Sequence, residues 1–479
     1  MLKIRHKASS LRRVPLGIAV VPVAVLFLSL AILIPVLGAE SIGDYSPWVL
    51  LGAAGVGALL STLTGGMRRR GMRVGFRRAA SQLLPAIPML ILIALLATSW
   101  MMAGVVPAMV TYGMGLVSAP LFLVVCCLVC ALVSVLTGSS WSTIATIGVA
   151  FIGIGDIMGH SAAWTAGAVI SGAYFGDKIS PLSDTTVIAS ATCEVEIFDH
   201  VRYMLATTLP ALAVAIAVFS IKGFTADAAP ASGTEDLAAA FSGVFTLSPW
   251  LLLIPASTVI LIALRVPTLL TLGIGSAAGL VTALLMQPSL LASGGGIWAA
   301  MAGAAKALAT GFSVTTGNPG VDSLVSTGGV WGIMPVVFLV LSALVFGWVM
   351  IGTGMLESIT DSLTRRLRRP VSIVSASLAS GLTLNACTAD QYLSIILGGN
   401  MYRRLYHRHR LENRLLSRSL EDAVSATSPL IPWSSCGVTQ AAVLGVSTVA
   451  YLPYCVFNYL TPVVALALAA AGWGIRRRA

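Results

Sequence analysis

The segment Ser171-Gly-Ala-Tyr-Phe-Gly-Asp-Lys-Ile-Ser-Pro-Leu-Ser-Asp-Thr-Thr186 has a pattern of apolar, charged and helix-breaking residues that is typical of a membrane protein. Hydropathy places it inside a membrane element, yet it contains Asp177, Lys178 and Asp184. A charge at that depth costs several kcal/mol unless it is paired or hydrated. Pro181 lacks a backbone donor and interrupts a helix, which leaves carbonyl groups of the preceding turn without intrahelical partners. The segment therefore predicts a broken membrane helix with carbonyl, hydroxyl and carboxylate oxygens at the break.

The composition of the whole chain agrees with a membrane protein. Of 479 residues, 57% are hydrophobic and only 10% are charged, and apolar stretches long enough to cross a bilayer recur from Val14 onward. The net charge of +11 comes from short basic clusters beside apolar spans, a pattern typical of loops that face anionic lipid rather than nucleic acid. The seven cysteines lack metal-site spacing and are expected to be packing residues. We expect no cofactor and no enzymatic activity.

Basic clusters indicate which loops face the cytoplasm. Such loops are enriched in Lys and Arg, and here the clusters are Lys3–Arg13, Arg68–Arg78, Arg365–Arg369, Arg403–Arg418 and Arg476–Arg478. Acidic residues such as Glu40 and Asp44 lie on the other side. The pattern predicts a multi-pass protein of a bacterial cytoplasmic membrane with both termini in the cytoplasm.

These patterns together predict an all-α polytopic membrane protein with about 10 transmembrane spans and two re-entrant hairpins. The expected spans are 14–38, 48–66, 81–104, a broken 161–193, 203–221, 249–264, 268–287, 331–355, a broken 419–447, and 451–472. The first hairpin has arms near 119–138 and 141–158. The second surrounds Asn385-Ala-Cys-Thr388.

An odd number of crossings on each side of an acidic linker predicts two inverted-topology repeats. The first repeat covers residues 1–222, a periplasmic linker covers 223–248, and the second repeat covers 249–479. Ser180-Pro-Leu182 recurs as Ser428-Pro-Leu430, an offset of 428 − 180 = 248, which would carry Thr137 onto Asn385. Chance similarity remains the alternative for so short a match. Inverted repeats place a transport site at their interface near the membrane midplane.

Polar residues at the hairpin tips and helix breaks are candidates for a site that binds cations and protons. From the residues alone these are Asp177, Asp184, Asn385, Thr388 and Asp390, with Lys178 expected to tune the carboxylate pKa and Pro181, Pro429 and Pro432 expected to break the helices. Because a carboxylate is either protonated or a cation ligand, Asp177 and Asp184 could exchange one ion for the other. Alternatively, Asp184 only caps a half-helix, and Asp177 and Lys178 lie at a loop edge.

Three further titratable residues have structural interpretations. Glu421 and Asp422, next to Arg418, are interpreted as a first-turn cap or a salt bridge at the cytoplasmic rim. His200 is close to an acidic segment and is interpreted as a solvated loop residue.

The quoted segments resemble the NhaC family of sodium/proton antiporters. The resemblance is carried by Ser171–Thr186, by Thr137-Gly-Ser-Ser-Trp-Ser-Thr143 and by Ser428-Pro-Leu-Ile-Pro-Trp433. It implies exchange of external protons for internal Na⁺, hence a role in pH homeostasis, and it adds Ser180, Thr185 and Ser428 to the candidate site. The family also includes malate/lactate exchangers, so a cation-coupled organic-acid exchanger is the alternative. A passive cation channel is a remote one. A homodimer is a further expectation.

Overall fold

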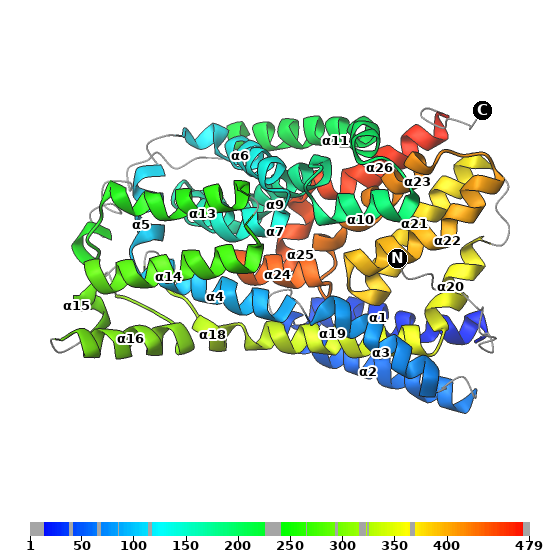
Figure 1. Ribbon diagram of the computed structural model, residues 1–479, viewed down its shortest axis with the longest axis horizontal. Helices are drawn as coiled ribbons and strands as arrows, with labels where there is room; N and C mark the ends of the chain where they lie inside the picture. The colour runs from blue at the N-terminus through cyan, green and yellow to red at the C-terminus, as the bar shows by residue number, and fades with distance from the viewer. Residues whose placement is uncertain are drawn as a thin grey trace.

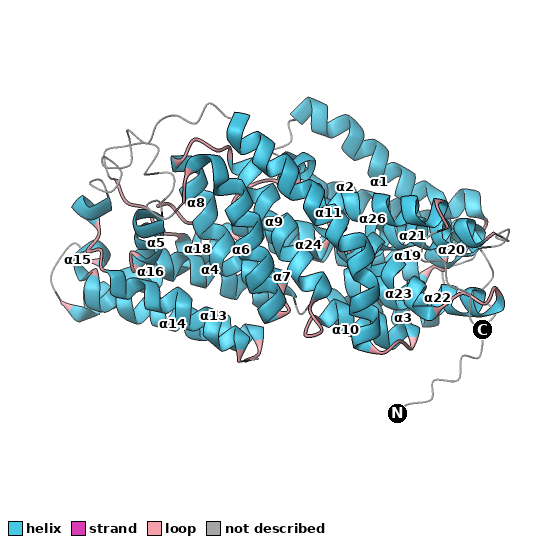
Figure 2. Ribbon diagram, turned by 90° about the horizontal axis from the view of Figure 1, so that it is seen from above, coloured by secondary structure: helices cyan, strands magenta, loops and turns pink. Residues whose placement is uncertain are grey.

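All regular structure in the described chain is helical, apart from one isolated bridge between Phe312 and Thr327 (Figures 1 and 2). The computed structural model describes residues 14–37, 42–64, 69–84, 86–113, 117–225, 241–264, 266–292, 296–315, 322, 325–364 and 369–472. Within these ranges, eight helices are long and apolar enough to cross a membrane, or up to ten if each bent helix pair is one span. These findings confirm the predicted all-α polytopic fold.

The first part of the chain forms helices up to Thr225. Here η3 is a π-helical turn and η2 a 3₁₀ turn. The elements are α1 (Leu16–Leu37), α2 (Ile42–Leu63), α3 (Arg69–Leu83), α4 (Ala86–Met102), α5 (Val105–Gly113), η2 (Ala119–Leu121), α6 (Phe122–Thr137), α7 (Ser140–Thr143), η3 (Ile144–Gly148), α8 (Val149–Ile157), α9 (Ala162–Ile179), α10 (Asp184–Cys193) and α11 (Ile197–Thr225).

The second part resumes after residues 226–240, which lie outside the described residues. Here η5 is π-helical, whereas η4, η6 and η7 are 3₁₀ turns. The elements are η4 (Pro249–Leu252), α13 (Leu253–Ala263), α14 (Thr268–Met286), α15 (Pro288–Leu291), α16 (Ile297–Thr310), α18 (Gly329–Gly332), α19 (Met334–Gly352), α20 (Met355–Thr364), α21 (Pro370–Thr388), α22 (Gln391–Arg408), α23 (Asn413–Leu420), η5 (Glu421–Ser425), η6 (Ser428–Leu430), α24 (Ser435–Leu444), α25 (Thr448–Tyr451), η7 (Leu452–Tyr454) and α26 (Val456–Ala470).

Both predicted hairpins are present, one formed by α6 with α7–α8 and the other by α21 with α22. Three of the four arms, Ala119–Thr137, Ser140–Ile157 and Pro370–Thr388, are long and apolar enough to cross a bilayer. Each hairpin returns the chain to the side of the membrane from which it came. The later helices therefore have the same orientation whether the hairpin arms cross the membrane fully or only enter it. The re-entrant insertion therefore stays a prediction.

Both predicted helix breaks are present as well. The chain leaves α9 at Ser180 and restarts as α10 at Asp184, so Pro181 lies in the gap. In the second part the helical path stops near Thr427, and α24 begins at Ser435 after a stretch that contains Pro429 and Pro432. α9 and α24 lie in the middle of the molecule (Figure 1), where the Gln440 amide of α24 donates to the Tyr174 hydroxyl of α9 (3.3 Å).

The register between the two parts corrects the sequence prediction by three residues. Left-handed C-cap residues end α6 at Gly138 and α21 at Ala389, which gives 389 − 138 = 251. The same offset relates the N-caps of α10 and α24, Ser183 and Ser434. It also relates the N-caps of α9 and α23, Ser161 and Glu412.

Pro181 therefore corresponds to Pro432, and Thr137 corresponds to Thr388 rather than Asn385. The Ser-Pro-Leu match at 248 is out of register because the helical path of the second part stops about one turn earlier. The segment between that point and α24, the 3₁₀ turn η6 followed by residues 431–434, is correspondingly longer than the segment between α9 and α10. Shared caps at one offset favour the predicted repeats, whose inverted orientation and boundaries remain predictions.

Each break is bonded to the hairpin of its own part. The Ser180 hydroxyl donates to the Val135 carbonyl (2.8 Å) beside the first tip. At the second tip the Trp433 indole donates to the Ala386 carbonyl (2.8 Å) and the Ser435 amide donates to the Ala389 carbonyl (2.8 Å). These bonds satisfy backbone carbonyl groups near the tips, which a buried chain must do.

Several elements differ from the sequence prediction. The basic segment expected as a cytoplasmic loop forms α3, whose Gly71 and Gly75 pack against the backbone of Gly352. Helices α5, α16 and α20 were not predicted, because each is shorter than a membrane span. The clusters Lys3–Arg13 and Arg476–Arg478, and Arg365–Arg368, lie outside the described residues. All seven cysteines are buried and free, as expected for packing residues.

Close packing of α6 on α9 fixes the position of the first break. A Cβ at Gly172 would lie 2.0 Å from the Cys127 carbonyl oxygen, and one at Gly176 would lie 2.3 Å from that of Ala131. Any side chain there forces the helices apart. The glycine spacing therefore sets how deep Asp177 sits against the first hairpin.

We expect Gly172→Ala to destabilise the protein by about 1–3 kcal/mol, because the added methyl group meets backbone rather than a movable side chain. Thermal unfolding in detergent measures the effect. Gly273→Ala in α14 is the matched control, since its Cβ meets nothing within 4 Å. Equal unfolding temperatures for the two variants would contradict the packing argument.

Candidate functional site

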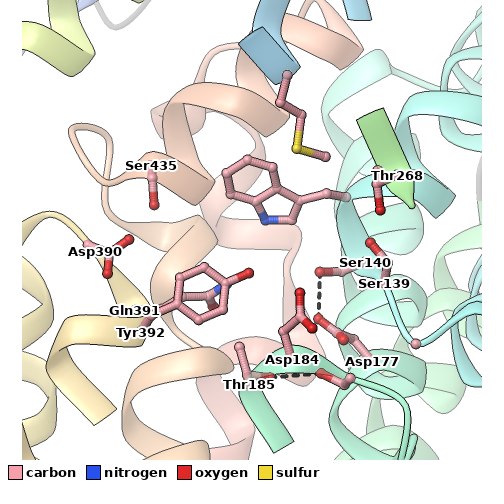
Figure 3. Close-up of a pocket in the computed structure, with 14 residues that line it drawn as sticks. Ser139, Ser140, Asp177, Asp184, Thr185, Thr268, Asp390, Gln391, Tyr392 and Ser435 are labelled. Atoms are coloured by element: carbon pink, nitrogen blue, oxygen red, sulfur yellow. Dashed lines mark hydrogen bonds between the residues drawn. The ribbon is translucent and has the colours of Figure 1, made fainter. Parts of the chain in front are cut away.

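A cavity of about 210 Å³ lies where the two hairpin tips meet the two helix breaks (Figure 3). Its lining comes from the first tip, the end of α9, the start of α10, the second tip, the start of α24, and two helices outside these elements. The lining residues are Met89, Gly138, Ser139, Ser140, Trp141, Asp177, Ser183, Asp184, Thr185, Thr268, Asp390, Gln391, Tyr392 and Ser435. Two parts of the chain more than 200 residues apart thus build one site.

Asp177 lies in the last turn of α9 and faces the first hairpin tip. The Ser140 hydroxyl donates to its Oδ2 at 2.7 Å, and the side chain is 8% exposed. Ser140 and Ser183 are the hydrogen-bonding neighbours of this carboxylate, and a carboxylate has about four acceptor sites, so lone pairs remain for a further partner. Asp177 is therefore placed to accept a proton or a cation in the cavity.

Asp184 begins α10, and its carboxylate points into the open part of the cavity (Figure 3). The N-cap of α10 is Ser183, not Asp184, so the capping alternative for Asp184 is wrong. The carboxylate lies in the first helical turn, where the helix dipole favours negative charge. Thr185 is the next residue, and its hydroxyl is 3.0 Å from that of Ser183.

The second hairpin tip contributes Asp390, Gln391 and Tyr392. Asp390 is the N-cap of α22: its Oδ1 accepts the Leu393 amide at 2.8 Å. One carboxylate oxygen is thus used in a cap, and the other faces the cavity region that Ser435 also lines. Asp390 therefore combines a structural role with a place at the site.

The structure brings four of the eight predicted binding residues to the cavity, namely Asp177, Asp184, Thr185 and Asp390. The other four do not line it. Ser180 donates to the Val135 carbonyl (2.8 Å), the Asn385 amide donates to the Val424 carbonyl (3.0 Å), the Thr388 hydroxyl donates to the Asp390 carbonyl (3.0 Å), and Ser428 is buried within the second break.

Sequence reasoning missed several lining residues. Ser183 and Tyr392 lie within two residues of Asp184 and Asp390, which it singled out. With the corrected offset of 251, Ser435 corresponds to Asp184 and would have been included. Met89 on α4 and Thr268 on α14 belong to other helices and carry no local signal.

Lys178 does not line the cavity. Its ammonium group is 2% exposed and pairs with Asp422 rather than with Asp177 or Asp184. Glu421 and Asp422 are both fully buried in the π-helical turn η5, so their interpretation as a rim salt bridge is wrong. His200 is also buried, and its Nδ1 is 2.8 Å from the Ser417 hydroxyl, so it is not a solvated residue.

The charge distribution in the cavity is one-sided. Asp177, Asp184 and Asp390 line it, whereas no Lys, Arg or His is among the described lining residues. The first turns of α10, α22 and α24 also reach it, and their amide dipoles stabilise ionised carboxylates. Hard oxygen ligands in this number suit a small cation.

Broken helices, paired hairpins and a central polar cavity are the architecture of a secondary transporter. The comparison with known proteins makes the assignment specific. A model described as the Na⁺/H⁺ antiporter family matches residues 15–186 and 172–473. The chain belongs to the Na⁺/H⁺ antiporter family.

Several relatives are similar over most of their length. The chain is 36% identical to the Na⁺/H⁺ antiporter NhaC of Alkalihalophilus pseudofirmus, with 85% of this chain and 87% of the relative covered. It is 34% identical to the arginine/ornithine antiporter ArcD of Halobacterium salinarum, covering 81% and 79%. It is 32% identical to the malate-2H⁺/Na⁺-lactate antiporter of Bacillus subtilis, covering 78% and 78%.

We expect Asp390→Ala to cost about 1 kcal/mol of stability through loss of the α22 cap, whereas Asp390→Asn keeps an adequate cap and unfolds near the wild-type temperature. Thermal unfolding of both variants in detergent checks this. If both lose the same stability, the carboxylate charge rather than the cap holds the second tip.

Proposed function

We propose that the protein exchanges Na⁺ for H⁺ across the bacterial cytoplasmic membrane, with both termini in the cytoplasm. The observation that carries the proposal is the cavity with three carboxylates and no basic side chain among its described lining residues. Its family membership and its similarity to NhaC antiporters support the same function.

In this proposal Asp177 and Asp184 form the site where Na⁺ and protons compete. A carboxylate cannot be protonated and ligate a cation with the same oxygen, so occupation by one ion excludes the other. The Ser140 hydroxyl orients Asp177, and Thr185 stands beside Asp184 as a neutral oxygen ligand. Ser180, Asn385 and Thr388 would act indirectly, since their side chains donate to backbone carbonyl groups near the cavity. Ser428 would act through the second break, to which it belongs.

Two relatives define the competing substrates. The malate/lactate exchanger keeps an organic-acid substrate open, because helix N-termini could hold a substrate carboxylate without arginines. The arginine/ornithine antiporter suggests a cationic amino acid as a further candidate substrate, which three carboxylates would also suit. Proton coupling distinguishes all of these from a passive channel, which cannot build one ion gradient from another.

Addition of Na⁺ to everted vesicles should dissipate an acid-interior gradient, with malate, lactate, arginine and ornithine at equal concentration having no effect. A proton-sensitive dye reports the flux. A requirement for any of the organic compounds would replace Na⁺/H⁺ exchange by the corresponding alternative.

Asp177→Asn and Asp184→Asn should each reduce Na⁺-dependent proton flux to background, because the amide cannot bind the proton that exchange must release. The matched control is Asp199→Asn, which changes an exposed residue at the start of α11. Near-normal flux in Asp184→Asn, with normal protein levels in the membrane, would leave Asp177 as the one competing carboxylate.

A further inference from the structure

A second group of ionisable side chains lies behind the cavity and does not line it. Lys178, Arg418, Glu421 and Asp422 are each no more than 2% exposed. They come from α9 on one side and from α23 and η5 on the other. Four ionisable groups buried together are far costlier than a hydrophobic core of the same size, which points to a role beyond packing.

Three members of this group compensate one another. The Lys178 ammonium pairs with Asp422, which also accepts a hydrogen bond from the Thr207 hydroxyl at 2.9 Å. Arg418 Nε lies 3.7 Å from the second Asp422 oxygen, and its guanidinium stacks over the Tyr203 ring at 4.7 Å. Asp422 is therefore held between two cations.

Glu421 is the member that makes no ion pair among the described residues, although the Lys178 charge and the Ser425 side chain act on it. Among the described residues, neither of its carboxylate oxygens has a hydrogen-bond partner, although the side chain is fully buried. Buried carboxylates that serve only the fold are hydrogen-bonded, because leaving them unsatisfied costs stability. The side chain also sits at the start of a π-helical turn, a feature that is often found at functional sites.

The charge of the group depends on Glu421. With Glu421 ionised, two cations and two anions cancel, whereas with Glu421 protonated the group carries one positive charge. The charged or titratable groups that interact with Glu421 are Asp177, Lys178, Cys193 and Asp422. Other members of the group have further neighbours: Tyr406 interacts with Arg418, and the Lys178 charge acts on His200 of α11.

The group is linked to the cavity through adjacent residues of α9. Lys178 directly follows Asp177, so the cation that pairs with Asp422 is one residue from the carboxylate that lines the cavity. A net positive charge on the group therefore repels a Na⁺ ion at Asp177, and this repulsion is strong because little water screens it.

We propose that Glu421 is a second proton-binding residue of this transporter, whose protonation weakens Na⁺ binding in the cavity through the Lys178–Asp422 pair. The inference rests on the proposed Na⁺/H⁺ exchange and adds a carboxylate outside the cavity to it. Protons then oppose Na⁺ twice, by occupying the cavity carboxylates and by charging the group behind them.

The test measures the KM for Na⁺ against pH in proteoliposomes for wild type, Glu421→Gln and Glu421→Asp. Gln fixes the group at one positive charge, so its KM at alkaline pH should rise about tenfold, and its pH dependence should become shallower. Asp can still ionise and should restore the pH dependence. Glu412→Gln is the control, since Glu412 pairs locally with Arg414 and lies outside the group.

A variant that changes the charge of the group in the opposite direction separates an effect of charge from an effect of structural damage. Arg418→Met removes one positive charge, so it should lower the KM for Na⁺ several-fold at acidic pH. Asp422 loses one of its two cations in this variant but keeps its pair with Lys178, and no hydrogen bond is lost, since all three guanidinium nitrogens of Arg418 lack hydrogen-bond partners among the described residues. This variant carries the test alone if Glu421→Gln does not fold.

The outcomes distinguish the inference from the proposed function. Absence of Na⁺-dependent proton flux in the wild type overturns Na⁺/H⁺ exchange itself. Wild-type exchange with an unchanged KM profile in Glu421→Gln, or an unchanged or raised KM in Arg418→Met, overturns the role of Glu421 and leaves exchange at the cavity intact.

Discussion

The buried ion pair between Lys178 and Asp422 joins the two broken elements of the protein. Lys178 comes from the end of α9, and Asp422 comes from η5, 244 residues later. Removing Asp422 would leave the buried Lys178 charge unpaired, which is among the costlier single changes in a protein. The pair thereby fixes α9 against η5, and with them the two breaks and hairpin tips that enclose the cavity.

Around this pair, polarity is distributed in layers. The cavity layer holds carboxylates and hydroxyls, the layer behind it holds the ionic group, and the outer helices present apolar side chains such as Leu28, Leu132 and Leu285, which are largely exposed. Such an arrangement is that of a membrane protein, in which lipid replaces water outside and polar groups are confined to the centre. The tight glycine contacts between α6 and α9 keep the layers in register.

The sequence predicted the helical membrane fold, both hairpins and both breaks, because hydropathy and proline act locally. It also singled out Asp177, Asp184 and Asp390, which line the central cavity. It could not predict the correct register between the two parts, since a three-residue match of Ser-Pro-Leu outweighed helix caps that only the backbone reveals. Nor could it predict the partners of Lys178 or the burial of Glu421 and His200, because those depend on helices that meet only in three dimensions.

The burial of all seven cysteines has a practical consequence for studying conformational change in this protein. A water-soluble thiol reagent should find almost no reactive sulfur in the folded chain, since reactivity requires an accessible thiolate. The natural sequence is therefore a low-background host for single engineered cysteines. Reporter thiols placed along either hairpin could record which side of the membrane each one meets without first replacing the native residues.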